Sequence, residues 1–319
     1  MDNTVLVIGG NGFIGYSVTK ELINRGINVK CLDVNRPEEK FAFYPVKYCI
    51  GDIWDRNFFH KSLDDVDCVM DFLSTSMPNT NDNSLSNEIG NTLRYHDYIL
   101  SSLKECGIKK YIFPSSGGAI YGNKESGYAV ETDILHPTTP YGVGKKMTEE
   151  IIQYYYEKCG IAACILRIGN VYGSPRIRSK AQGVIDVFTQ NALRGETITI
   201  WGNAKNSIRD YIHLEDVANA VVSVFQKGFN DLRVYNVGTG VGTNLAQIID
   251  LIGQKLNQKI NCEYKESMAS GIKSIILSNK KIINEIGWVP HITLSEGIQK
   301  TIDIKRELLD LNNGRYGYE

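Results

Sequence analysis

Short apolar runs alternate with longer amphipathic stretches through the first half of the chain. Each run is nearly continuous in hydrophobic residues, as expected for a parallel strand that helices cover on both faces. The runs predict strands at residues 5–8, 28–32, 46–49, 68–73 and 111–114, with two more at 162–166 and 234–237. This alternation predicts an α/β fold with a Rossmann-type, doubly wound parallel sheet.

The pattern changes after Arg167. We expect residues 1–170 to form the Rossmann domain, joined by a returning segment at about 214–240. Residues 171–213 and 241–319 are expected to form a smaller, mixed α/β lobe on the C-terminal side, which binds the substrate. Because no Pro-, Gly- or Ser-rich linker and no repeat separates these parts, we expect one rigid body. Helices are predicted at residues 16–24, 144–159 and 183–193, and a hairpin around 198–201.

The composition is that of an ordinary globular protein, with 42% hydrophobic and 22% charged residues among 319 and a formal net charge of −1. Without a polybasic tract, we expect no nucleic-acid and no membrane partner. The first strand follows the N-terminus too closely for a signal peptide, and no apolar run is long enough to cross a bilayer. The seven cysteines are scattered and lack zinc-binding spacing, so we expect free thiols, no metal site and a cytoplasmic location.

A glycine-rich turn, Gly9, Gly12 and Gly15, joins the first strand to the first helix. Such glycines allow a sharp turn that brings backbone N–H groups and a helix N-terminus against a pyrophosphate. Asp33 ends the second strand at the spacing expected of the acid that binds an adenosine ribose. Because a strand precedes this turn and a helix and a second strand follow it, the sequence favours a turn that binds NAD over a turn that binds no ligand. The neighbouring Arg36 leaves NADP as an alternative cofactor.

Other residues at strand ends are expected to border the same cofactor. Asp52 follows the third strand, near the expected place of the adenine, although a plain loop acid is an equally good interpretation. The remaining cofactor-binding candidates are Phe13, Ile14, Ile53, Leu73 and Ser74.

Tyr141 and Lys145 are four residues apart at the start of a helix, so their side chains share one face. A lysine ammonium favours the phenolate of a nearby tyrosine, which can then take a proton from a sugar hydroxyl as hydride leaves. Ser115 and Ser116 end a central strand, where a doubly wound sheet binds its ligand. Alone, the Tyr-x-x-x-Lys spacing is common on surface helices, and a serine beside glycine often only satisfies a turn.

Together these features resemble the extended short-chain dehydrogenases/reductases, within the NAD-dependent epimerase/dehydratase family, and especially the UDP-glucose 4-epimerase-like enzymes. The resemblance implies NAD as the cofactor, Tyr141 as the base and Lys145 on the nicotinamide ribose. It favours Ser116 over Ser115 as the hydroxyl partner. Further matching residues, in the family's order, are Glu131, Arg167, Asn170, Tyr172, Trp201, Arg209, Asp210, Tyr211, His213 and Asp216.

The resemblance also implies a nucleotide-sugar substrate. Asn170 and Arg209 would bind its diphosphate, with Tyr211 in the same site and Asn91 near the catalytic hydroxyls. In relatives, helices corresponding to residues 88–106 and 144–159 pair across a dimer axis, which implies a homodimer.

Two departures from the family pattern affect the reaction. The Asp-Glu pair of the dehydratases is replaced by Gly117 and Gly118, which disfavours elimination of water. Met268 and Gly271 stand where relatives carry an arginine and an aspartate at the diphosphate.

We therefore expect hydride transfer at sugar carbon four, as in an NDP-hexose 4-epimerase of the UDP-glucose or UDP-GlcNAc type. The alternatives are a one-way NDP-sugar oxidoreductase, either a 4-keto-6-deoxysugar reductase or a sugar or heptose 4-dehydrogenase, and a non-catalytic NAD sensor.

Overall fold

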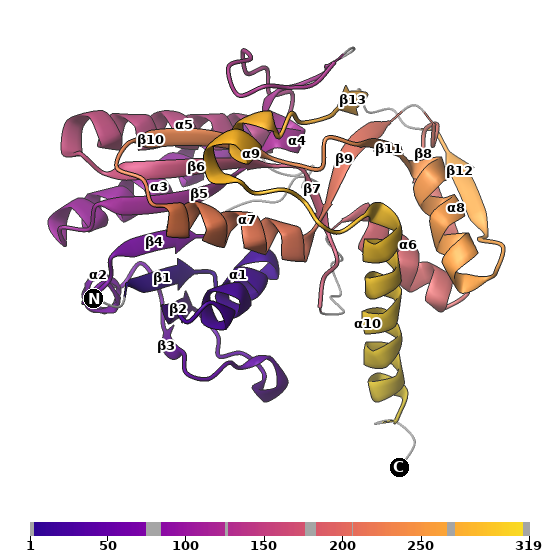
Figure 1. Cartoon of the computed structure of the whole chain (residues 1–319), viewed down its shortest axis with the longest axis horizontal. Helices are drawn as coiled ribbons and strands as arrows, with labels where there is room; N and C mark the ends of the chain where they lie inside the picture. Colours follow the sequence, from indigo (N-terminus) through magenta and orange to yellow (C-terminus); the bar gives the residue numbers. More distant parts are fainter. Residues whose placement is uncertain are drawn as a thin grey trace.

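Seven parallel strands form the central sheet, in the order β10-β6-β5-β4-β1-β2-β3 (Figure 1). This order reverses between β1 and β4, so the carboxyl ends of these two strands flank the crevice where such sheets bind ligands. Every strand predicted for this sheet is present, within two residues at each end, which confirms the doubly wound α/β fold. The strands are β1 (Thr4–Ile8), β2 (Asn28–Asp33), β3 (Lys47–Ile50), β4 (Cys68–Asp71), β5 (Lys110–Ser116), β6 (Ala162–Ile168) and β10 (Leu232–Val237).

The computed structural model describes residues 3–74, 84–124, 127–175, 183–205, 207–266 and 272–314. Within these ranges no helix has the length and apolar character that a membrane span requires. All seven cysteines are free thiols, as the sequence predicts.

Helices cover both faces of the large sheet, which explains why its strands are apolar throughout. Val5 and Val7 of β1 are buried beneath α1 and α7, whereas Leu6 and Ile8 face the core formed with α2, α3 and α5. All four side chains are fully buried. The helices are α1 (Phe13–Asn24), α2 (Arg56–Ser62), α3 (Leu85–Glu105), α5 (Pro140–Cys159) and α7 (Leu214–Lys227), with the short η1 (Glu39–Phe41) and α4 (Gly117–Ile120) in connecting segments.

A second group of strands lies beyond the carboxyl end of the large sheet. One small sheet contains β11, β9 and β13, with β7 also paired to β9, and β8 pairs with β12 in another. These strands are β7 (Asn170–Tyr172), β8 (Ile198–Trp201), β9 (Ile208–His213), β11 (Gly242–Asn244), β12 (Cys262–Lys265) and β13 (Ser274–Ile275). The helices beside them are α6 (Val184–Leu193), α8 (Leu245–Leu256) and α10 (Leu294–Gly314).

Two features of this region differ from the sequence predictions. The strand at residues 198–201 is present, but the hairpin is wrong, because β8 pairs in parallel with β12 and places Ile198 opposite Cys262. In addition, α9 (Lys280–Ile286) packs on the large sheet, since Ile282 and Trp288 belong to the core cluster beneath α7. Part of the segment assigned to the smaller lobe therefore covers the Rossmann core instead.

Candidate active site

The glycine turn after β1 has the geometry of a dinucleotide cradle. Gly9 has a φ of +71°, and a Cβ atom there would lie 2.9 Å from the backbone nitrogen of Leu73. The N–H of Gly12 donates to the Gly9 carbonyl at 2.8 Å, and α1 begins at Phe13. The turn thus presents the N-terminus of α1 at the carboxyl end of the sheet, which suits the pyrophosphate of NAD.

Asp33 lies beside this turn at the end of β2. Its Oδ2 accepts a hydrogen bond of 3.1 Å from the backbone N–H of Asn11, inside the turn. Asp52 is exposed and accepts from Trp54 N–H at 3.0 Å, whereas Ile53 is buried and its carbonyl accepts from the Tyr98 hydroxyl at 2.9 Å. Asp33, Asp52 and Ile53, which are expected to hold the adenosine, therefore lie at or just after the ends of the neighbouring strands β2 and β3. Their hydrogen-bonding groups fit NAD.

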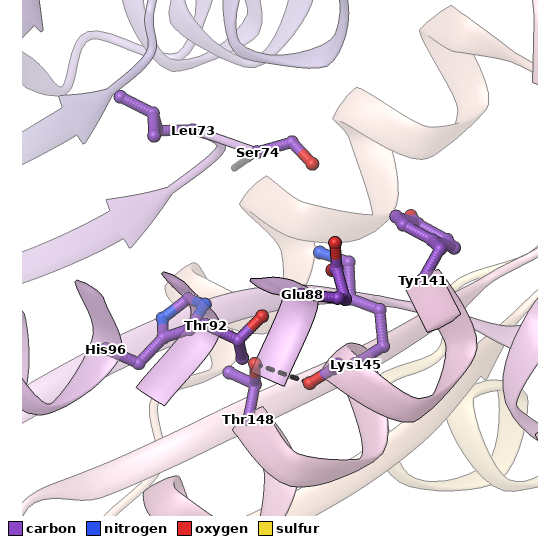
Figure 2. Close-up of a pocket in the computed structure, with 9 residues that line it drawn as sticks. Leu73, Ser74, Glu88, Thr92, His96, Tyr141, Lys145 and Thr148 are labelled. Carbon is purple, nitrogen blue, oxygen red and sulfur yellow. Dashed lines mark hydrogen bonds between the residues drawn. The ribbon is translucent and has the colours of Figure 1, made fainter. Parts of the chain in front are cut away.

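A pocket at the ends of β4, α3 and α5 brings several predicted residues together. Leu73 and Ser74 form one wall, opposite Tyr141 and Lys145 on α5 (Figure 2). The lining also contains residues that the sequence prediction missed, namely Glu88, Thr92, His96, Gly144 and Thr148. The spacing of four between residues 88, 92 and 96 on a helix could have indicated one shared face.

Asn91, by contrast, does not line this pocket. Its side chain is exposed on α3, and the next residue, Thr92, is the one that faces the pocket. The place of Asn91 near the catalytic hydroxyls stays a prediction.

A hydrogen bond joins the side chains of Ser116 and Tyr141, so the strand end of β5 and the start of α5 converge on one hydroxyl. Burial raises the pKa of Tyr141 to about 12, whereas the hydrogen bond with Ser116 lowers it and the Glu88 carboxylate adds to the rise. The sequence predicts a phenolate favoured by Lys145, but the Lys145 ammonium lies 5.8 Å from the centre of the Tyr141 ring, and burial dominates. The tyrosine of this structure is therefore protonated at neutral pH.

Lys145 is held by the strand that carries the serine. Its ammonium donates to the Pro114 carbonyl at 2.9 Å and lies 4.5 Å from the centre of the Phe113 ring. Burial lowers the pKa of Lys145 to about 8, against the opposing effects of Asp71, Glu149 and Glu88. Three carboxylates thus help to keep a buried ammonium charged.

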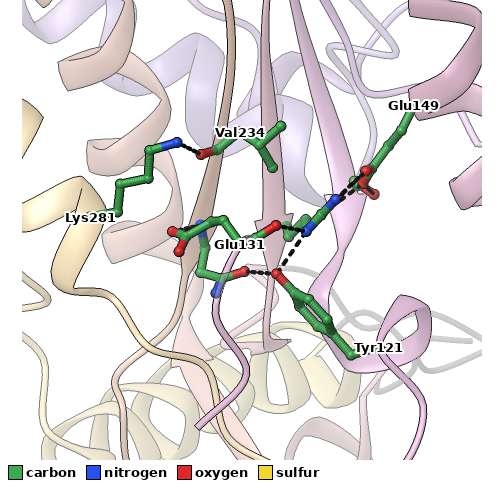
Figure 3. Close-up of polar contacts among 8 residues, drawn as sticks. Tyr121, Glu131, Glu149, Val234 and Lys281 are labelled. Carbon is green, nitrogen blue, oxygen red and sulfur yellow. Dashed lines mark hydrogen bonds and ion pairs between the residues drawn. The ribbon is translucent and has the colours of Figure 1, made fainter. Parts of the chain in front are cut away.

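Ser115 belongs to a buried polar network. Its hydroxyl donates to Glu149 at 2.6 Å, and Glu149 forms a 2.7 Å ion pair with Arg167. Arg167 also donates to the Tyr121 hydroxyl at 3.0 Å and to the Glu131 carbonyl at 2.9 Å (Figure 3). Ser115 therefore connects β5 to α5 and β6 inside the protein, whereas Ser116 contacts Tyr141.

The residues expected at the substrate diphosphate lie on the paired strands β7 and β9. Asn170 is opposite Tyr211 in this pairing, and Tyr211 is buried. Arg209 donates to the carbonyls of Ile208 at 2.9 Å and of Lys273 at 3.3 Å, and also to the Ile272 carbonyl. In this structure its guanidinium thus holds the backbone entering β13. Met268 and Gly271 lie outside the described residues.

Gly117 and Gly118 carry no side chain that could act as an acid or a base. A Cβ atom at Gly117 would lie 3.0 Å from the Arg167 carbonyl, whereas one at Gly118 would meet the side-chain oxygen Oδ1 of Asn170 at 2.7 Å.

Comparisons with known proteins agree with this geometry. The model of the "NAD dependent epimerase/dehydratase family" matches residues 5–238. A dTDP-4-dehydro-6-deoxyglucose reductase of Escherichia coli is 29% identical over 94% of this chain and 96% of its own length. A putative UDP-glucose 4-epimerase of Methanocaldococcus jannaschii is 30% identical over 94% of this chain and 97% of its own.

Solved structures show the same fold over nearly the whole chain. UDP-glucose 4-epimerase of Thermotoga maritima with UDP-glucose superposes with a TM-score of 0.84 at 30% identity, over 96% of this chain and 99% of that one. The Thermus thermophilus UDP-glucose 4-epimerase in complex with NAD gives a TM-score of 0.86 at 26% identity, over 95% and 99% of the two chains.

Proposed function

The chain belongs to the NAD-dependent epimerase/dehydratase family of extended short-chain dehydrogenases/reductases, and from that premise we propose that it is a nucleotide-sugar 4-epimerase. The observation that carries the proposal is the convergence of Ser116, Tyr141 and Lys145 at the carboxyl end of β5. A serine, a tyrosine and a lysine so placed can move a proton at one sugar oxygen. Bound NAD supplies the hydride acceptor and donor.

The chain's own residues would orient the cofactor and the sugar. Gly9, Gly12 and Gly15 with the N-terminus of α1 would bind the pyrophosphate, and Asp33 the adenosine ribose. Phe13, Ile14, Asp52, Ile53, Leu73 and Ser74 would complete the cofactor site. Lys145 would bind the nicotinamide ribose.

At the sugar, Ser116 would donate a hydrogen bond to the oxygen on carbon four. In its phenolate form Tyr141 would take the proton of this hydroxyl in the oxidation, and the resulting phenol would return it in the reduction. Asn170, Arg209 and Tyr211 would hold the diphosphate part, since a planar guanidinium matches phosphate oxygens. For Arg209 this requires exchange of its present backbone carbonyl partners for phosphate.

Elimination of water is not part of this proposal. Gly117 and Gly118 supply no acid or base at these positions. The identity of about 30% to UDP-glucose 4-epimerases supports UDP-hexoses as the first substrates to test.

A one-way reductase of a 4-keto sugar is the second candidate. Since the pKa of Tyr141 is raised to about 12, its hydroxyl is protonated at neutral pH and able to donate to a carbonyl oxygen. The similarity to the E. coli dTDP-4-dehydro-6-deoxyglucose reductase supports the same alternative. Both candidates use the same three residues.

We also propose a homodimer that forms through α3 and α5, which pack against each other in the chain. Leu93 of α3 and Tyr154 of α5 are 49% and 57% exposed, which suits burial in such an interface. The free thiols support a reducing compartment such as the cytoplasm.

The reaction is tested by incubating the purified protein with UDP-, GDP- and dTDP-sugars, while NADH absorbance and sugar identity are followed. The proposal expects a 4-epimer without NADH accumulation. Accumulation of a keto sugar with NADH, or reduction that requires added NADH or NADPH, would replace it with the one-way oxidoreductase. Tyr141→Phe is the control, with turnover lower by about 10²–10⁴-fold.

A further inference from the structure

Glu88 is a buried carboxylate in the pocket that contains Tyr141 and Lys145 (Figure 2). It lies in the first turn of α3, and only 4% of the residue is exposed. Its side chain lies against Gly144 of α5, where a Cβ atom would be 2.7 Å from Oε1 of Glu88. A glycine one residue before Lys145 thus makes room for an acid from the neighbouring helix.

We propose that Glu88 is a positioning residue whose buried negative charge sets the protonation state of the Tyr141 and Lys145 pair, stabilising the lysine ammonium and disfavouring the tyrosine phenolate. This inference rests on the proposed roles of Tyr141 and Lys145. It assigns Glu88 no contact with the sugar.

The physical basis is the weak screening of charges inside a protein, where two charges at a given separation interact about four times more strongly than in water. Glu88 accordingly raises the pKa of both Tyr141 and Lys145, although burial remains the largest influence on each. One acid therefore keeps the lysine charged while it keeps the tyrosine protonated.

Other ionisable groups around the pair have different partners. Asp71 of β4 accepts hydrogen bonds from the hydroxyls of Tyr95 at 3.0 Å and Tyr111 at 2.9 Å, and burial raises its pKa to about 6. Glu149 of α5 is paired with Arg167 at 2.7 Å. Both carboxylates favour the charged form of Lys145.

His96, on the same helix as Glu88, is neutral near pH 7, because burial and the charge of Lys145 lower its pKa to about 3. Among the carboxylates of the described part of the chain, Glu88 is the one that lines the pocket with both reactive side chains.

The test is the substitution Glu88→Gln, which removes the charge and keeps the size. Loss of the negative charge lowers the pKa of both Tyr141 and Lys145. We therefore expect both limbs of the pH profile of kcat/KM to move to lower pH, by about one unit. Glu88→Asp restores the charge and is expected to restore the profile. Glu150→Gln removes an exposed carboxylate from α5 and is expected to leave both limbs in place.

A second readout does not need turnover. The phenolate absorbance of Tyr141 is measured by pH titration of the NAD-loaded protein, and the titration of the Tyr141→Phe variant is subtracted from it. The same difference is measured with Glu88→Gln present in both proteins. We expect the Tyr141 phenolate to form at lower pH when Glu88 is replaced by glutamine. If the wild type turns over none of the sugars, this titration still tests Glu88, so the two proposals fail separately.

Unchanged limbs, limbs that move in opposite directions, or an unchanged phenolate titration would overturn the proposal, even if kcat falls. If Glu88→Gln does not fold, Gly144→Ala provides the test, because its Cβ atom displaces the Glu88 carboxylate without removing it. The two limbs are then expected to move together, and no movement would overturn the inference.

Discussion

The hydroxyl of Ser115 donates a 2.6 Å hydrogen bond to the buried carboxylate of Glu149. This bond turns Ser115 into the interior of the protein, between β5 and α5. Successive residues of a strand point to opposite faces, so the next residue, Ser116, is the one that meets Tyr141. Two adjacent serines with similar sequence surroundings are thereby given different roles.

Alanine substitutions of Ser115 and Ser116 are expected to have opposite effects on activity and stability. Ser116→Ala removes the hydrogen bond to Tyr141 and is expected to lower kcat by about 10²-fold. Ser115→Ala leaves Glu149 paired with Arg167 and is expected to keep kcat within about threefold, while it lowers the free energy of unfolding by about 1–3 kcal/mol. Steady-state kinetics and urea denaturation of both variants measure these effects. A larger loss of kcat in Ser115→Ala than in Ser116→Ala would reverse the assignment.

The Glu149 and Arg167 ion pair is expected to contribute mainly to stability. Arg167 is 6% exposed, so Arg167→Met leaves a buried carboxylate without its partner, which costs about 3–5 kcal/mol. The half-exposed pair of Arg233 and Asp231 is the control, because Arg233→Met should cost about 1 kcal/mol or less. The free energy of unfolding from denaturant titration gives both numbers. Equal losses in the two variants would contradict the role given to the buried network.

Gly9 and Gly26 form a matched pair for testing the dinucleotide cradle. Both have a φ of +71°, but a Cβ atom at Gly9 would lie 2.9 Å from the backbone of Leu73, whereas one at Gly26 would have nothing within 4 Å. Gly9→Ala must therefore displace the turn, and we expect the Kd for NAD to rise at least about tenfold, or about 1.4 kcal/mol. Gly26→Ala should cost stability of the order of 1 kcal/mol with an unchanged Kd. Equal NAD affinities of the two variants would show that the turn does not hold the cofactor.

His96 predicts a pH dependence of stability. Burial lowers its pKa to about 3 in the folded state, whereas a histidine of the unfolded chain titrates near pH 6.5. Between these values the unfolded state binds a proton that the folded state does not, so stability falls as the pH decreases, by up to about 1.4 kcal/mol per unit. His96→Phe removes this contribution, so it should lose less stability than the wild type between pH 7 and pH 5.

Asp71 acts in the opposite direction over part of this range, because its folded-state pKa of about 6 is raised. Both proteins contain Asp71, but its Oδ2 lies 3.8 Å from Nδ1 of His96, so the difference between the denaturant titrations at the two pH values reports on the two groups together. A wild type and a His96→Phe variant with the same pH dependence would contradict the neutral state of His96.

The large sheet was predictable from sequence because its strands are buried on both faces. Residues 5–8 show this best, since all four side chains are fully buried and none is polar. The partner of β8 was not predictable, because Cys262 lies far along the chain from Ile198 and parallel pairing leaves no local turn signal. Pairing between distant segments depends on packing that no short window of sequence contains.

Within the site, residues that belong to a sequence motif were easier to predict than residues that influence their protonation state. Tyr141 and Lys145 follow from their spacing at the start of a helix, whereas the choice of Ser116 over Ser115 followed from the family resemblance. Glu88 carries no motif, and its place opposite Gly144 depends on how α3 is rotated against α5. The raised pKa of Tyr141 was likewise not predicted, because burial cannot be judged from the distance along the chain to Lys145.

In the proposed 4-epimerisation, hydride leaves and returns at carbon four of the sugar through a retained cofactor. The decisive experiment uses a UDP-hexose that carries deuterium at carbon four, incubated with the holoenzyme in ordinary water and analysed by NMR. We expect a 4-epimer that keeps its deuterium at carbon four, while no NADH is released. Replacement of the deuterium by hydrogen from water, or an epimer formed at another carbon, would contradict it.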